Sequence, residues 1–208
     1  MEESQQAATV YNKIAKSYAS NFKNHSEHID KFLSLIDKNG KILDVGCGCG
    51  TDANYISSKG FTVVGIDLSR GMIRLAKENF PKIRFEVKDM RKLAFRPNSF
   101  EGILVAYSLI HIPKKDVLST LKLLYSFLKK KGIIYVALLS GKSQELFISE
   151  PLKPNLETFL NVFSEDETIR LLRKSGFSII QKYKRKSKNK EEFDFAKSFV
   201  LARKVVAN

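Results

Sequence analysis

The sequence predicts an α/β fold with a single, mostly parallel sheet of seven strands flanked by helices. Two observations support this prediction. Short apolar runs alternate with amphipathic stretches of helical period along most of the 208 residues, which is typical of a parallel sheet with crossover helices. The first apolar run, 42–45, leads straight into a turn with glycine at alternate positions, Gly46, Gly48 and Gly50. A strand followed by such a turn is typical of ligand-binding α/β folds.

Length and composition favour one folded domain over residues 1–208. Hydrophobic residues make up 43% of the sequence and aromatic residues 11%, which argues against disorder, and single cores commonly extend over this length. The first residues lack the basic and apolar regions of a secretory signal. The longest apolar run, 102–112, is too short to cross a bilayer. We therefore expect a soluble cytoplasmic protein that does not bind a membrane.

Two amphipathic helices are expected before the first strand and form an N-terminal cap over residues 1–38. The first lies within 9–21 and the second over 29–36, where it ends near Asn39 and Gly40. Both predictions rest on apolar residues that recur at helical spacing.

The glycine-rich turn is expected to bind a ligand. Its glycines let the backbone approach a ligand closely, and the helix predicted from Thr51 offers free N–H groups to an anionic group. Asp44 precedes the first glycine by two residues, and Asp67 ends the next apolar run, where it can reach ribose hydroxyls. A dinucleotide fingerprint needs glycine at the position of Thr51, so a nicotinamide dehydrogenase is disfavoured.

The alternation of strand and helix continues toward the end of the chain. Ser69 is expected to cap a helix that ends at Phe80. The remaining elements are strands at 83–87, 99–107 and 133–139, a helix at 115–130, a helix opened by the capping-box pattern at 164–167, and a hairpin of strands at 177–183 and 195–205. Residues 140–163 are too broken for a long element and too apolar for a linker, so we expect an irregular lid there.

Three segments together resemble class I S-adenosylmethionine-dependent methyltransferases. The stretch Asp44-Val-Gly-Cys-Gly-Cys-Gly50 with Asp67 resembles motif I and the acidic end of the following strand in this family. The stretch Tyr11-Asn-Lys-Ile-Ala-Lys-Ser-Tyr18 is similar to the family's Y-[DN]-x-x-A-x-x-Y segment. Ser108-Leu-Ile-His-Ile-Pro113 resembles the S-L-L-H-x-P segment of its small-molecule members. The resemblance spans roughly the whole chain and implies the family's sheet, in which the last strand is antiparallel.

The resemblance implies a cofactor site for S-adenosylmethionine, with S-adenosylhomocysteine as the product. Glycines and amides of the turn would contact the methionine portion, Asp67 the ribose, Leu68 and Met90 the adenine ring, and Asp89 its amino group. Two alternatives stay open: Tyr18 could only pack against its neighbours, and Asp89 could only cap a turn. The full predicted cofactor set is Tyr18, Asp44, Gly46, Cys47, Gly48, Gly50, Asp67, Leu68, Met72, Asp89, Met90 and Ala106.

The end of the fourth strand is expected to face the methyl acceptor. His111 has a reference pKa suited to a general base, although a histidine can also orient a loop, and Tyr107 is the second candidate catalytic residue. On the predicted lid, Phe147 and Phe159 could line the substrate pocket or pack in the core. Glu145 and Glu150 could attract a cationic substrate or lie on a solvated surface.

No metal and no disulfide are predicted. Cys47 and Cys49 both lie inside the glycine-rich turn, where a disulfide framework would make no architectural sense, and we expect them to be reduced. Magnesium-dependent methyltransferases need acids at the end of the fourth strand, where this sequence has Tyr107 and Ser108.

The predicted function is metal-independent methyl transfer to a nitrogen or oxygen of a small molecule, by a monomer or homodimer. Two alternatives stay open. The net charge of +14 includes a basic turn at 182–190 that could contact RNA phosphates, so structured RNA could be the acceptor. The chain could also be a regulatory subunit that binds the cofactor without turnover.

Overall fold

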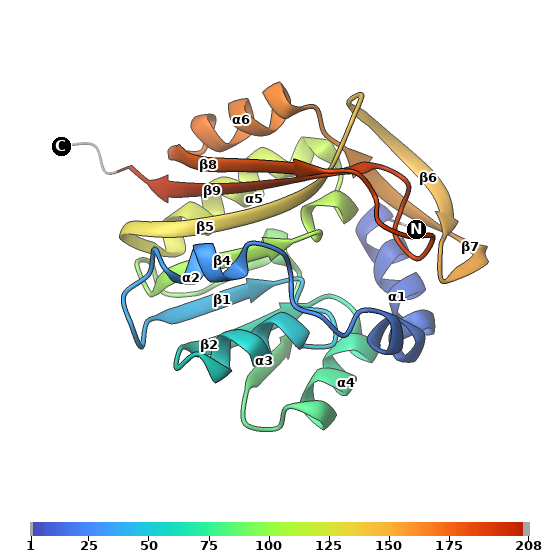
Figure 1. Cartoon of the computed structure of the whole chain (residues 1–208), viewed down its shortest axis with the longest axis horizontal. Coiled ribbons are helices and arrows are strands. Elements are labelled where there is room, and N and C mark those ends of the chain that lie inside the picture. The colour runs from blue at the N-terminus through green and yellow to red at the C-terminus, as the bar shows by residue number, and fades with distance from the viewer. Residues whose placement is uncertain (1, 206–208) are drawn as a thin grey trace.

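The computed structural model describes residues 2–205, in which a seven-stranded sheet carries helices on both faces (Figure 1). The sheet order is β3-β2-β1-β4-β5-β9-β8. Strand β9 pairs antiparallel with β5 and β8, and the other pairings are parallel. The predicted fold is therefore confirmed. The strands are β1 (Lys41–Val45), β2 (Thr62–Asp67), β3 (Arg84–Val87), β4 (Phe100–Ala106), β5 (Leu128–Ser140), β8 (Phe177–Arg185) and β9 (Ala196–Lys204).

Six helices and two short 3-10 turns connect the strands over residues 2–205. Ser69 caps α4 and Ser164 caps α6 with their side chains, as predicted. No helix in this range is long and apolar enough to cross a membrane. The helices are α1 (Glu3–Asn21), α2 (Ile29–Leu33), α3 (Thr51–Ser58), α4 (Arg70–Asn79), α5 (Lys114–Phe127) and α6 (Glu165–Lys174), with 3-10 turns η1 (Met90–Lys92) and η2 (Leu109–His111).

Each face of the sheet has its own apolar cluster. On one face α5 contributes Val117, Leu121 and Leu124 to the larger cluster. On the other face α2 packs directly on the backbone of β4, because a Cβ at Gly102 would lie 2.8 Å from Cζ of Phe32. Burial on both faces explains why the central strands are nearly all apolar.

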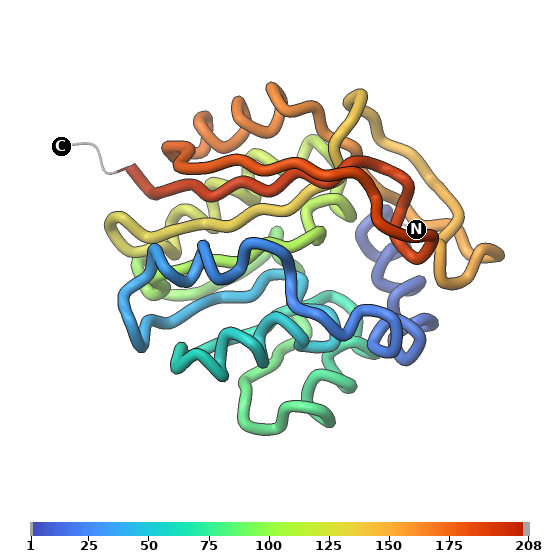
Figure 2. Tube along the Cα trace, viewed as in Figure 1, coloured from blue at the N-terminus to red at the C-terminus, as the bar shows by residue number. Residues whose placement is uncertain are grey.

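The prediction of an irregular segment at 140–163 is wrong. Residues Gln144–Glu150 (β6) and Lys153–Val162 (β7) form an antiparallel hairpin that lies beside α1 (Figure 2). The buried part of β7 contains the polar residues Thr158 and Asn161, which interrupt the apolar pattern of the sequence. The Asn161 amide donates to the Ile112 carbonyl, so a contact distant in sequence permits its burial.

Ser69→Ala is expected to lower the free energy of unfolding more than Ser164→Ala does. Ser69 Oγ accepts from the Met72 amide at 3.2 Å and also donates to Asn12 Oδ1 at 2.9 Å, which ties α4 to α1. Loss of a cap costs about 1 kcal/mol, and the second bond adds about 1 kcal/mol. Urea denaturation of both variants measures the difference. Equal losses would show that the Asn12 bond contributes nothing.

Candidate active site at the carboxyl edge of the sheet

Two cavities lie side by side at the carboxyl ends of β1, β2 and β4. The large cavity has a volume of about 320 Å³ and the small cavity about 110 Å³. Both are lined by residues of α1, of the glycine-rich turn and of the end of β4, so the two cavities share one wall. The shared lining residues are Tyr11, Tyr18, Gly46, Gly48, Ala106 and Tyr107.

The glycine-rich turn is held by the end of β2. The amides of Gly46 and Cys47 donate to the Ile66 carbonyl at 2.7 and 2.9 Å, and the Gly48 amide donates to Asp67 Oδ2 at 2.9 Å. These amides were expected to face the ligand, but they are bonded within the protein. A Cβ at Gly48 would come no nearer than 3.9 Å to Tyr18, so the glycine leaves open space at the shared wall.

Asp67 and Asp89 line the same small cavity. Asp67 accepts one bond on each oxygen, from the amides of Gly48 and Ser69. Burial raises the pKa of Asp67, and these bonds oppose the shift. Since a carboxylate has about four accepting sites, Asp67 retains capacity for ribose hydroxyls.

Asp89 is bound more fully by the protein. Arg91 donates three bonds to it, from its amide at 2.9 Å and from Nε and Nη2 at 3.0 and 2.6 Å. Burial alone would raise the pKa of Asp89, but these bonds hold that pKa below its usual range. Asp89 thus caps a turn, as the alternative interpretation predicted, and it also lines the small cavity. About one accepting site of its carboxylate remains for an adenine amino group.

The other predicted cofactor residues fall into two groups. Leu68, Met72 and Met90 line the small cavity, and Cys47, a free thiol, lines the large one. Asp44 and Gly50 line neither of these cavities. Asp44 is 1% exposed, and within residues 2–205 its Oδ2 has no hydrogen-bond partner. A Cβ at Gly50 would meet Phe85 at 2.8 Å, so this glycine permits core packing at the start of α3.

His111 lines the small cavity and contacts Tyr11, which lines both cavities. Its Nδ1 lies 2.9 Å from the Phe159 carbonyl, which can only accept, so Nδ1 carries the proton. Its Nε2 then accepts from the Tyr11 hydroxyl at 3.0 Å. Burial lowers the pKa of His111 to about 4, with the Phe159 bond opposing that shift. The sequence predicts no role for Tyr11, because nothing in the local pattern shows a contact 100 residues away.

The free energy of unfolding is expected to decrease as the pH is lowered, because of His111. Its pKa in the unfolded chain is about 6.5, so its neutral buried form contributes full stability above pH 6.5, and that contribution is lost as pH falls toward 4. Between pH 7 and 5 this loss is on the order of 1 to 2 kcal/mol. Urea unfolding at both pH values compares the wild type with His111→Gln, which is expected to show the smaller fall. Equal falls would mean that His111 does not titrate as inferred.

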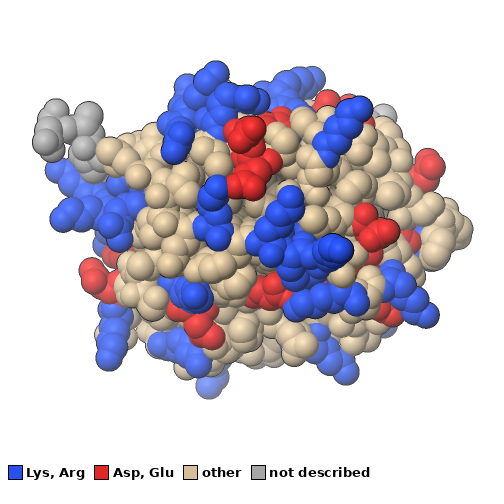
Figure 3. Space-filling model, turned by 45° about the horizontal axis from the view of Figure 1, so that its top comes forward, with Lys and Arg blue, Asp and Glu red and all other residues tan. Residues whose placement is uncertain are grey.

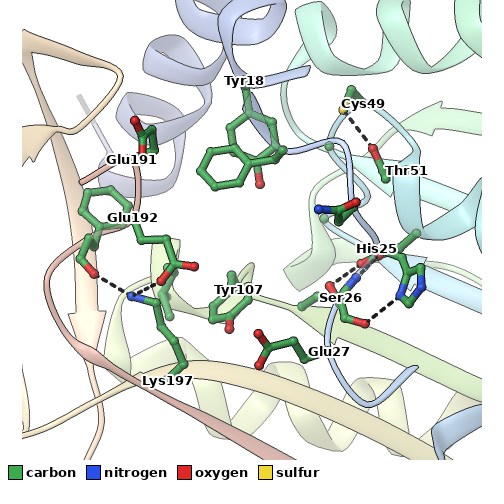
Figure 4. A pocket seen from close by; sticks show the side chains of 18 of the residues that line it. Tyr18, His25, Ser26, Glu27, Cys49, Thr51, Tyr107, Glu191, Glu192 and Lys197 are labelled. Atoms are coloured by element: carbon green, nitrogen blue, oxygen red, sulfur yellow. Dashed lines mark hydrogen bonds and ion pairs between the residues drawn. The ribbon is translucent and has the colours of Figure 1, made fainter. Parts of the chain in front are cut away.

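Charged residues complete the large cavity. Figure 4 shows Tyr18 and Tyr107 across from each other, with Glu192 and Lys197 on one side between them and Glu27 near Tyr107. The Tyr107 hydroxyl is buried, and in the described chain it has no hydrogen-bond partner. A group that binds in the cavity could provide one.

Comparisons with known proteins agree with this geometry. Residues 42–132 match a family model described as a methyltransferase domain. This match covers the glycine-rich turn, the small-cavity carboxylates Asp67 and Asp89, and His111. In this domain and in its fold, the chain is similar to the class I S-adenosylmethionine-dependent methyltransferases.

Individual relatives support the family and the fold. An uncharacterised methyltransferase of Alkaliphilus oremlandii is 32% identical over 136 residues, which are 65% of this chain and 58% of that protein. The chain spans about half the length of the first curated relatives it matches. A methyltransferase structure from Methanosarcina mazei superposes with a TM-score of 0.78 at 21% identity, over 88% of this chain and 100% of that one.

A second solved structure indicates the family's cofactor. The Burkholderia thailandensis 1,6-didemethyltoxoflavin-N1-methyltransferase, with bound S-adenosylhomocysteine, superposes with a TM-score of 0.72 at 17% identity, over 99% of this chain and 92% of that one. S-adenosylmethionine is the cofactor of this methyltransferase family. The open space at Gly48 and the spare accepting capacity of Asp67 fit such a group.

Proposed function

We propose that this methyltransferase transfers a methyl group from S-adenosylmethionine to a nitrogen or oxygen of a small molecule, without a metal. The supporting observation is the wall shared by the two cavities: a cofactor in the small cavity and an acceptor in the large one would meet beside Gly48, Tyr18 and Tyr107. A volume of about 320 Å³ is within the range for small-molecule sites.

The cofactor would be held by the residues of the small cavity. Asp67 would accept bonds from the ribose, Asp89 from the adenine amino group, and Leu68 and Met90 would cover the ring. When bound, S-adenosylmethionine supplies an electrophilic methyl group. The chain itself contributes alignment and exclusion of water, which are the main requirements for such a displacement.

Tyr11, Tyr107 and His111 would orient the acceptor. The Tyr107 hydroxyl is free to bond an acceptor atom, and the Tyr11 hydroxyl is fixed by His111 Nε2. His111 would therefore act as a positioning residue through Tyr11, and it can take up a proton that passes along this bond. Direct base catalysis by His111, as predicted from the sequence, would require the Tyr11 bond to break first.

The paired charges of the basic turn support a small-molecule acceptor over RNA. Arg185 Nε pairs with Glu27 at 2.9 Å, Arg185 Nη1 with Glu192 at 2.8 Å, and Lys188 with Glu27. Elsewhere, on the face shown in Figure 3, basic side chains are dispersed with acids among them. RNA binding depends on cations available to phosphates, and these pairs reduce their number in the turn.

Methyl-labelled S-adenosylmethionine tests the proposed function. The protein is incubated with the small-molecule fraction and, separately, with the RNA fraction of a cell extract, and labelled products are identified by mass spectrometry. Label in a small molecule is the expected result. Label in RNA alone would favour the RNA alternative, and cofactor binding without label in either fraction would favour a regulatory subunit.

A further inference from the structure

Glu150 is a buried acid in the wall of the large cavity. It ends β6, where Leu146 and Ile148 face the core and Glu145 and Phe147 face outward, so Glu150 occupies the third inward position of the strand. Glu150 is 3% exposed, so the alternative that it lies on a solvated surface is wrong. The pairing register with β7 shifts between Ser149, which lies opposite Glu157, and Glu150, which lies opposite Lys153.

The Glu150 carboxylate is only partly satisfied by the protein. Oε1 accepts from the Leu152 amide at 3.3 Å, while Oε2 has no hydrogen-bond partner in residues 2–205. Burial raises the pKa of Glu150, and the bond from Leu152 opposes this. A buried acid without a partner is unfavourable unless a ligand supplies a donor or a positive charge.

The lining of the large cavity carries a surplus of negative charge. It includes five acids (Glu27, Asp52, Glu150, Glu191 and Glu192) and three bases (Arg185, Lys188 and Lys197), so its balance is 3 − 5 = −2, in a chain of net charge +14. The three bases pair with Glu27 and Glu192, and Asp52 accepts two bonds from Ser26. Among the described residues, Asp52, Glu150 and Glu191 have no ion pair, and of these three Asp52 is the one bonded by Ser26 through both of its oxygens.

Aromatic rings form the wall beside Glu150. Tyr11 and Tyr18 pack edge to face with centroids 5.8 Å apart, and Phe22 lies 4.6 Å from Tyr18. All three line the large cavity together with Tyr107. Aromatic faces attract organic cations, and the attraction increases where water is excluded.

We propose that the acceptor is a small organic cation, an amine or ammonium compound whose charged nitrogen pairs with Glu150 against the rings of Tyr11 and Tyr18. This proposal rests on the proposed function, because it names the class of molecule that enters the large cavity. The charged nitrogen is a recognition group here and need not be the atom that is methylated. The unpaired acid, the aromatic wall and the negative balance of the lining all favour the same class of ligand.

The test uses a matched pair of probes, tetramethylammonium and neopentyl alcohol, which have similar shape and differ in charge. Each is titrated by calorimetry at pH 8 into the full chain, with and without saturating S-adenosylhomocysteine. The wild type is expected to bind the cation at least 10-fold more tightly than the alcohol. Glu150→Gln is expected to lose this preference and to keep its melting temperature, since it removes a buried charge. The control Glu145→Gln alters an exposed acid of the same strand and is expected to keep the preference.

Two results would overturn the proposal: equal affinity for both probes in the wild type, and a preference for the cation that survives in Glu150→Gln. If, in the second case, the variant also binds S-adenosylmethionine more weakly but S-adenosylhomocysteine normally, Glu150 serves the sulfonium of the cofactor instead. Failure of S-adenosylhomocysteine to bind the wild type would instead count against the proposed function, and the titrations without it would still measure the preference for the cation.

Discussion

Replacing Gly46 by alanine is expected to remove about 3 to 5 kcal/mol from the free energy of unfolding and to abolish cofactor binding. The backbone at Gly46 has φ +74°, and an added Cβ would lie 2.2 Å from Ser108 Cβ. Ser108 is buried, and its hydroxyl donates to the Val45 carbonyl at 2.6 Å, so it cannot move aside cheaply. Urea denaturation measures the loss of stability, and titration with S-adenosylmethionine measures the loss of binding.

Gly48→Ala is the matched control for this experiment. Gly48 also has a positive φ, +52°, but an added Cβ would have only Tyr18 near it, at 3.9 Å. The expected cost is about 1 to 2 kcal/mol from backbone strain alone, with weakened cofactor binding because the methyl group enters the shared wall. If the two variants lost equal stability, the close contact between Gly46 and Ser108 would not be the cause.

Asp67→Asn is expected to weaken S-adenosylmethionine binding by roughly 30- to 100-fold, which corresponds to about 2 to 3 kcal/mol. The substitution removes charge-assisted bonds to the ribose and replaces one acceptor of the bonds from Gly48 and Ser69 with a donor. Equilibrium dialysis with labelled cofactor measures the affinity. Asp37→Asn, at an exposed acid before β1, is the control and is expected to bind as the wild type does. Equal affinities for the two variants would refute a ribose contact by Asp67.

The fold could be predicted from the sequence because its signals are local. Apolar runs, the glycine-rich turn and the caps at Ser69 and Ser164 each fix a nearby stretch of backbone, and the alternation of elements then leaves few topologies. The β6–β7 hairpin could not be predicted in this way. Thr158 and Asn161 are polar residues in a buried strand, and only the distant contact of Asn161 with Ile112 shows why.

For the candidate site, the sequence predicts which residues lie close together but not how they are bonded. The sequence places Gly48, Asp67 and Asp89 at strand ends, and the structure brings these three residues to the small cavity. Sequence spacing does not show which polar groups are already paired. The bonds of Asp89 to Arg91 and of Tyr11 to His111 both depend on side-chain direction, and the burial of Glu150 depends on the hairpin that was missed.

The basic turn illustrates the same limit for charge. Its lysines and arginine suggested a phosphate-binding surface, but Glu27 lies 158 residues away from Arg185 in sequence and pairs with it. Net charge counts residues, whereas binding depends on which of them remain unpaired.

A crystal structure of the full chain with S-adenosylhomocysteine would show directly where the cofactor binds. We predict the ribose hydroxyls within hydrogen-bond distance of Asp67, the adenine ring between Leu68 and Met90, and the sulfur at the wall between the two cavities, beside Gly48 and Tyr18. A nucleoside bound in the large cavity near Glu150, or a ligand that does not contact Asp67, would show that the cofactor site is assigned wrongly.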